Sequence, residues 1–162
     1  MKADNEGKSP LHLACQHGHL KIVNCILESQ LYSKDVLEAC DKKKNTAMHL
    51  ACRGGNCGIV ELLIEKGAKT NAANGKKRTP IHTAAKYGFI NIVKILEGKE
   101  PFKCWDYCKR TPLHLAAKYN NVKVIEFLHE WYVQALVKLK ISEIIILASL
   151  PLLEYLSNKG QA

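Results

Sequence analysis

Apolar residues along the chain gather in pairs of short blocks separated by polar turns, and each pair is followed by a similar one. The first block of every pair is a variant of Thr-Pro-Leu-His-Leu-Ala-Ala, and the four copies occupy residues 9–15, 46–52, 79–85 and 111–117. Their first residues lie 37, 33 and 32 positions apart. A nearly fixed period of this length predicts stacked copies of one supersecondary unit rather than one closed core.

The two blocks of each copy are predicted to form two short antiparallel helices. Apolar residues in the second block follow a helical spacing, which gives one buried stripe per helix. The stripe residues are Ile22, Val23 and Ile26, then Ile59, Val60 and Leu63, then Ile92, Val93 and Leu96, and finally Val124, Ile125 and Leu128. The first copy also carries about four extra residues within 28–39, which we expect to form a long loop.

Each motif contains the signals that begin and end a helix. The opening Ser or Thr is a preferred N-cap, and proline suits the next position because its missing N–H is not needed there. A histidine three residues after the cap can reach back to it. We therefore assign structural capping to the four motif histidines, His12, His49, His82 and His114. Nine residues after the caps stand residues that accept the left-handed backbone ending a helix, namely Gly18, Gly55, Gly88 and Asn120.

Polar turns precede the motifs. Five residues before each cap stands a turn-starting residue, namely Asp4, Asp41, Asn74 or Asp106. Because such turns connect one helix pair to the next, we expect them to project from the stack as fingers.

These motifs resemble the ankyrin repeat over residues 4 to about 130. The resemblance implies an all-α solenoid of stacked helix pairs with finger turns, in four repeats at about 4–40, 41–73, 74–105 and 106–130. Family members usually have glycine two residues before the motif threonine, but here only Gly7 follows that rule, and the others are Lys44, Lys77 and Lys109. Lysine in a left-handed turn costs about 1 kcal/mol, which favours a function for these lysines.

The repeat pattern fades after residue 130. Apolar residues keep a helical spacing there, and the stretches 142–148 and 152–160 resemble a decayed motif and a second helix. We therefore expect residues 131–162 to form a degenerate fifth repeat or a helical C-terminal cap. A non-native tail is the alternative.

The composition indicates a reducing compartment and suggests the sign of the charge on a binding partner. Twenty-four Lys and Arg against fifteen Asp and Glu give a formal charge of +9, which favours an acidic partner. Seven cysteines are an odd number without a C-x-x-C pair, which argues against a secreted disulfide framework. We find no signal peptide, and the longest uncharged apolar run, residues 144–153, is shorter than the roughly 20 residues of a membrane span. We expect a protein of the cytoplasm or nucleus.

One cysteine differs from the others in its surroundings. Four cysteines occupy positions that are apolar in the other copies, which predicts core residues: Cys15, Cys25, Cys52 and Cys57. Cys108 instead lies in a finger beside Lys109 and Arg110, and neighbouring cations favour a thiolate. Cys108 is therefore a candidate reactive thiol, and the alternative is an exposed thiol without a role.

The sequence contains no motif for catalysis, a cofactor or a metal. Phosphate-binding loops, the H-E-x-x-H helix, the nucleophile elbow and the dinucleotide fingerprint are all missing. Stacked helices lie about 8–10 Å apart, whereas a zinc–nitrogen bond is about 2 Å long, so motif histidines of neighbouring repeats cannot share a metal. We expect a non-catalytic protein without a cofactor.

Basic residues recur at equivalent positions of the fingers and of the first helices. Stacking aligns them into a ridge, which predicts a protein-interaction scaffold that binds an acidic segment with its fingers and its concave helix face. The predicted ridge consists of Lys43, Lys44, Arg53, Lys76, Lys77, Arg78, Lys86, Lys109, Arg110 and Lys118. One alternative is a merely solvated surface, and another is an anionic-lipid or polyphosphate site. Nucleic acid is disfavoured because aromatic residues are few and groove-reading elements are missing.

A second resemblance suggests a different class of protein. The spacing of the first two motifs, with the long loop between them, is similar to the cytosolic array of ankyrin-type transient receptor potential channels. This resemblance implies a fragment of the sensing domain of a membrane-associated cation channel. It covers only the repeats, and this chain alone could not conduct ions.

Overall fold

The computed structural model describes residues 3–29, 34–99, 104–134 and 137. The chain divides into two compact units, Met1–Glu126 and Phe127–Ala162. Within the second unit, residues 127–134 and 137 are helical. Most of the predicted cap at 131–162 lies outside the described residues, so this assignment stays a prediction.

The first unit is built of short helices in pairs. They are α1 (Pro10–His17), α2 (Leu20–Glu28), α3 (Lys34–Glu38), α4 (Ala47–Gly54), α5 (Cys57–Glu65), α6 (Pro80–Tyr87), α7 (Ile90–Leu96) and α8 (Pro112–Lys118). Residues 122–134 and 137 are helical as well, and the described residues contain no strand. The predicted all-α repeat architecture is confirmed.

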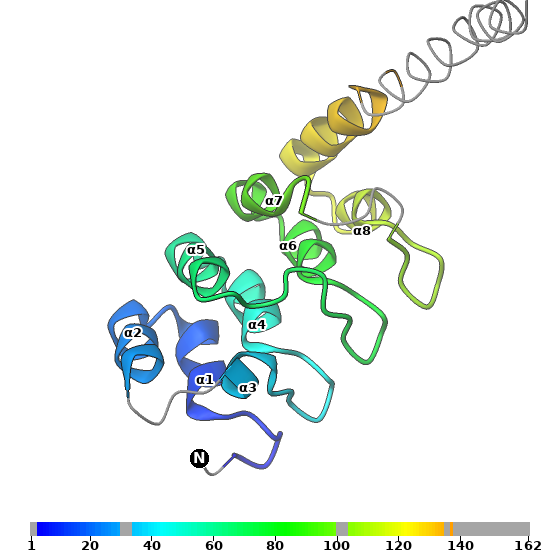
Figure 1. Ribbon diagram of the computed structural model, residues 1–162. Coiled ribbons are helices and arrows are strands. Elements are labelled where there is room, and N and C mark those ends of the chain that lie inside the picture. The colour runs from blue at the N-terminus through cyan, green and yellow to red at the C-terminus, as the bar shows by residue number, and fades with distance from the viewer. Residues whose placement is uncertain (1–2, 30–33, 100–103, 135–136, 138–162) are drawn as a thin grey trace, which may run out of the picture. The chain divides into compact units, whose positions relative to one another are not determined.

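The helices of the first unit lie in two layers (Figure 1). Helices α1, α4, α6 and α8 pack in succession in one layer, and α2, α5 and α7 form the other. The finger turns project beside the α1, α4, α6 and α8 layer. The core lies between the layers, where small side chains of the motif such as Ala51 and Ala84 are fully buried. Small residues there allow the helices to approach closely and bury the apolar stripes.

The apolar stripe is buried in the inner repeats but not throughout the first one. Ile59 and Ile92 are 2% and 0% exposed, whereas the equivalent Ile22 is 51% exposed. The prediction that Ile22 is buried was therefore wrong. In α5 and α7 this position follows a preceding helix pair, and α2 has no such pair among the described residues.

The extra residues of the first repeat were predicted to form a long loop, but some of them are helical. Residues 34–38 form α3, which packs on α4 and buries Leu37. The Glu38 carboxylate also accepts a hydrogen bond from the Lys69 backbone N–H at 2.9 Å. The burial of Leu37 and the bond of Glu38 both hold this short helix in place.

Candidate functional site

An Asp or Asn side chain shapes every finger. One Asp41 carboxylate oxygen accepts backbone N–H bonds from Lys43 and Asn45, both at 2.8 Å. The same two bonds, to the second and fourth following residues, form in the other fingers at Asp4, Asn74 and Asp106. The turn is therefore a local structure that each repeat builds from its own residues.

Lysine adopts a left-handed backbone in three of the fingers. The φ angles of Lys44, Lys77 and Lys109 are 58°, 56° and 56°, and Gly7 has the equivalent conformation in the first finger. A side chain in this region costs about 1–2 kcal/mol, because the Cβ atom crowds the following carbonyl. The expected strain at these lysines is present.

Backbone hydrogen bonds connect successive fingers. The Lys42 N–H donates to the Glu6 carbonyl at 2.9 Å, and the Gly75 N–H donates to the Lys43 carbonyl at 2.8 Å. The Tyr107 N–H continues the series to the Lys76 carbonyl at 3.2 Å. A Cβ atom at residue 75 would lie 2.9 Å from the Lys43 oxygen, so glycine there permits the close approach.

The motif histidines hold both their own helix and the next finger. In all four motifs the cap residue donates its backbone N–H to histidine Nδ1, at 3.1–3.4 Å. Nδ1 is therefore an acceptor, and the ring proton is on Nε2. From there it is donated to a carbonyl of the following finger, by His12 to Asn45 at 3.2 Å, by His49 to Arg78 at 2.8 Å and by His82 to Arg110 at 3.1 Å.

Burial keeps three of these histidines neutral. It lowers the pKa of His12, of His49 and of His82, the last to about 4, although the hydrogen bond to the carbonyl of the next finger opposes this shift. Both ring nitrogens of each are already hydrogen-bonded. Within the described part of the chain, no group of three or more His, Cys, Asp and Glu residues is placed to hold a metal ion.

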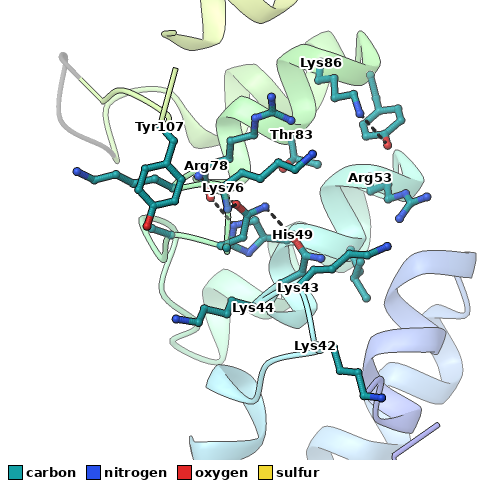
Figure 2. A pocket seen from close by; sticks show the side chains of 17 residues that line it. Lys42, Lys43, Lys44, His49, Arg53, Lys76, Arg78, Thr83, Lys86 and Tyr107 are labelled. Atoms are coloured by element: carbon teal, nitrogen blue, oxygen red, sulfur yellow. Dashed lines mark hydrogen bonds between the residues drawn. The ribbon is translucent and has the colours of Figure 1, made fainter. Parts of the chain in front are cut away.

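A groove of about 690 Å³ lies between the second and third fingers and the helices α4 and α6 (Figure 2). One wall consists of finger residues, and the other consists of helix residues such as Arg53 and Lys86. Eight of the seventeen residues lining the groove are basic, and none of the seventeen is acidic. The basic residues are Lys42, Lys43, Lys44, Arg53, Lys76, Lys77, Arg78 and Lys86.

Two tyrosines surround the ammonium group of Lys86. Its Nζ atom lies 4.7 Å from the centroid of the Tyr87 ring and 5.1 Å from that of the Tyr119 ring. The guanidinium carbon of Arg53 lies 6.0 Å from the centroid of Tyr87. These are cation–π distances, and they orient both cations on the helix wall of the groove.

Comparison with known proteins identifies the repeats. A family model described as ankyrin repeats, in three copies, matches residues 1–74 and 71–138. The chain belongs to the ankyrin-repeat family. Ankyrin repeats generally mediate protein–protein interaction and are typically non-catalytic.

A curated relative of this ankyrin array is the probable 26S proteasome regulatory subunit p28 of Saccharomyces cerevisiae. The two sequences are 30% identical over 95 residues, which cover 59% of this chain and 41% of the relative. The chain therefore spans less than half the length of that protein. None of the helices in the described ranges is long and apolar enough to cross a membrane.

Two arginines of the predicted ridge are bound to an acidic residue. The Arg78 Nε and Arg110 Nη2 atoms lie 3.2 and 2.9 Å from one oxygen of Asp106, whose side chain is 1% exposed. Burial alone would raise the pKa of Asp106, but hydrogen bonds from Arg110 and Arg78 outweigh it and hold the pKa well below its usual value. Sequence reasoning missed this cluster, although Asp106 at the start of its finger and Arg110 at its end were visible signals.

Seven of the ten predicted ridge residues line the groove, and the other three do not. Lys109 and Lys118 are exposed, on the fourth finger and at the end of α8, and Arg110 is paired with Asp106. Lys42 lines the groove and was absent from the predicted set. The part of the predicted ridge that lines the groove comes from the second and third fingers and from α4 and α6.

The cysteines are buried, half-buried or exposed, and Cys57, which was predicted to be a core residue, is half-buried. Cys15 and Cys52 are fully buried, and burial raises the pKa of Cys15 to about 12. Cys25 is exposed, which corrects the prediction that it is a core residue. Like Ile22 it belongs to α2, the first outer helix of the described stack. Cys108 is exposed in the fourth finger, and its reactivity stays a prediction.

Proposed function

We propose that this ankyrin array is a non-catalytic interaction module that binds an acidic segment of a partner protein in the groove between its second and third fingers. The observation that carries the proposal is the convergence of finger lysines and helix cations on one groove without any acidic lining residue. Like charges held this close favour a ligand that neutralises them.

The groove is a better candidate than the rest of the ridge, because its lysines are less neutralised. In the fourth finger, Arg110 is already paired with Asp106. In the first finger, Glu6 lies 2.7 Å from Lys8, and its pKa is lowered by the hydrogen bond and the charge of Lys8 and by the charge of Lys43. Arg78 of the groove is paired with Asp106 as well, so the attraction of the groove for an acidic partner comes from its five finger lysines and its two helix cations.

A phosphate-bearing ligand, either an anionic lipid headgroup or a polyphosphate, is the second candidate. The same convergence of cations supports it. The yeast relative is named as a probable subunit of a protein complex, which supports a protein partner and a site of action in the cytoplasm or nucleus. The channel hypothesis remains an alternative that an extended transcript would test.

The proposal is tested by fluorescence anisotropy with a labelled glutamate-rich peptide. We expect binding that weakens as salt increases and that is about tenfold weaker in the variant K43Q/K76Q/K77Q. The matched control is K21Q/K69Q/K123Q, which removes three exposed lysines outside the groove. Equal binding by the two variants would show that the groove is not the binding site. Binding to phosphoinositide vesicles but not to the peptide would show that the ligand is a lipid rather than an acidic protein segment.

A further inference from the structure

The cations of the groove are arranged in pairs, one member from each of two successive repeats. Lys43 and Lys76 occupy equivalent positions of the second and third fingers, and Arg53 and Lys86 occupy equivalent positions of α4 and α6. Figure 2 shows Lys43 extending toward the side of Arg53, whereas Lys44 extends to the opposite side of its finger. The groove therefore presents two files of positive charge, one on each wall.

The stacking of the repeats sets the spacing within each file. Helices α4 and α6 pack directly on one another, and packed helices lie about 8–10 Å apart. The fingers are held together by the bond from the Gly75 N–H to the Lys43 carbonyl at 2.8 Å. A ligand that contacts both members of a file therefore fits the repeat spacing best when its acidic groups lie about 8–10 Å apart on one of its faces.

Among the regular backbone conformations, polyproline II fits this spacing with the fewest residues. It has three residues per turn and rises about 3.1 Å per residue, so every third side chain returns to the same face after about 9.3 Å. In a β-strand, side chains three residues apart point to opposite faces. An α-helix needs seven residues to return after about 10.5 Å, and it is about 10–12 Å wide.

We infer that the partner segment lies in the groove as an acidic polyproline II helix, with one file of carboxylates on Lys43 and Lys76 and the adjacent file on Arg53 and Lys86. This inference rests on the proposed function and names the conformation and spacing of its ligand. The third face of the segment points to solvent and accepts proline. Tyr107 and Tyr87 line the groove as well, and aromatic grooves are typical docking sites for polyproline II segments.

Two peptides of identical composition test the inference by calorimetry with the full chain. One repeats Glu-Glu-Pro, and the other holds the same residues in an order without a three-residue period. Because net charge and composition are equal, a difference in Kd reports the arrangement of the acidic residues along the peptide, and we expect the periodic peptide to bind about tenfold more tightly. Equal Kd values would overturn the inference and leave the proposed function in place, whereas failure of both peptides to bind would overturn the proposed function.

A variant locates the preference on the protein. The variant K43Q/K76Q loses the finger file, so only Arg53 and Lys86 can still pair with carboxylates at the repeat spacing. Its preference for the periodic peptide should therefore fall to about twofold or less. The control K21Q/K123Q should keep the full preference, and circular dichroism verifies that both variants fold. A preference that survives unchanged in K43Q/K76Q would overturn the assignment of the finger lysines.

Discussion

The motif histidine makes different hydrogen bonds in the inner repeats and in the fourth repeat. His49 and His82 are at most 1% exposed, and each bonds its own cap residue and the carbonyl of the next finger. His114 makes the same bond to its cap, Thr111, but it is exposed. Among the described residues, its side chain bonds only to Thr111.

The difference separates a local role from a role between repeats. Capping needs only residues of one repeat, so it is present in all four motifs. The bond from Nε2 to a carbonyl needs a following finger, and among the described residues it occurs at the three contacts between successive repeats. We call each such contact, with its histidine and the fingers it joins, a joint.

The largest expected effect comes from breaking the joint that contains the arginines. Asp106→Ala should lower the free energy of unfolding by about 3–4 kcal/mol, because Arg78 and Arg110 lose their acceptor and the finger loses its turn bonds. Urea denaturation measures the loss. Asp4→Ala in the first finger removes the same turn bonds without an arginine pair, and a loss as large in that variant would contradict the role given to the arginines.

The next largest effect is expected from removing a motif histidine, and its size should differ between an inner repeat and the fourth. His82→Ala should destabilise the protein by about 2–3 kcal/mol, because it removes a cap, a bond to the next finger and a buried ring. His114→Ala removes the cap alone, for which about 0.5–2 kcal/mol is expected. Both are measured by urea denaturation. Equal losses would mean that the bond between repeats contributes no stability.

Acid should weaken the joints. Because the pKa of His82 is lowered from 6.5 to about 4 on folding, the unfolded chain binds protons more readily over this range. The contribution of His82 to the free energy of unfolding is therefore full above about pH 6.5 and is lost as the pH falls to about 4, and it amounts to about 3 kcal/mol. Urea midpoints across this range test the slope. His82→Gln should flatten it, and an unchanged slope would show that other groups cause the loss.

The smallest expected effect comes from a substitution that makes the third finger resemble the first. Lys77→Gly replaces a strained lysine by the residue that the first finger has at Gly7, and should stabilise the array by about 1 kcal/mol. Thermal melting detects the gain. Lys76→Gly, at a neighbouring position without a positive φ, is the control and should give no gain. Stabilisation of both variants alike would point to a general effect of removing charge.

Structures completed within one repeat were predictable from the sequence. The cap, the histidine that reaches back to it and the turn-starting Asp or Asn make bonds over two to four residues, and their spacing recurs in every copy. The helices therefore begin close to where the motif places them. The lysines at left-handed positions could also be identified, because Gly7 shows what the turn needs.

Features that depend on the neighbour of a repeat were not predictable in the same way. Arg78 meets Asp106 across 28 residues, and no local pattern shows that a ridge cation is already paired. Ile22 and Cys25 match apolar positions of the other repeats, but their burial depends on a preceding helix pair rather than on the motif. The short helix α3 lies outside the repeated motif and buries Leu37 against α4.

The acceptors in the joints have a consequence for how this array can diverge. His12, His49 and His82 bond to backbone carbonyls, which every amino acid supplies. The bonds that the Lys42, Gly75 and Tyr107 N–H groups donate to the preceding finger likewise use backbone atoms. The bonds from Arg78 to Asp106 and from Asn74 to Asn45 are the ones that depend on particular side chains. Substitutions at the finger tips can therefore alter which ligand is recognised while the scaffold persists, so recognition and architecture can evolve separately.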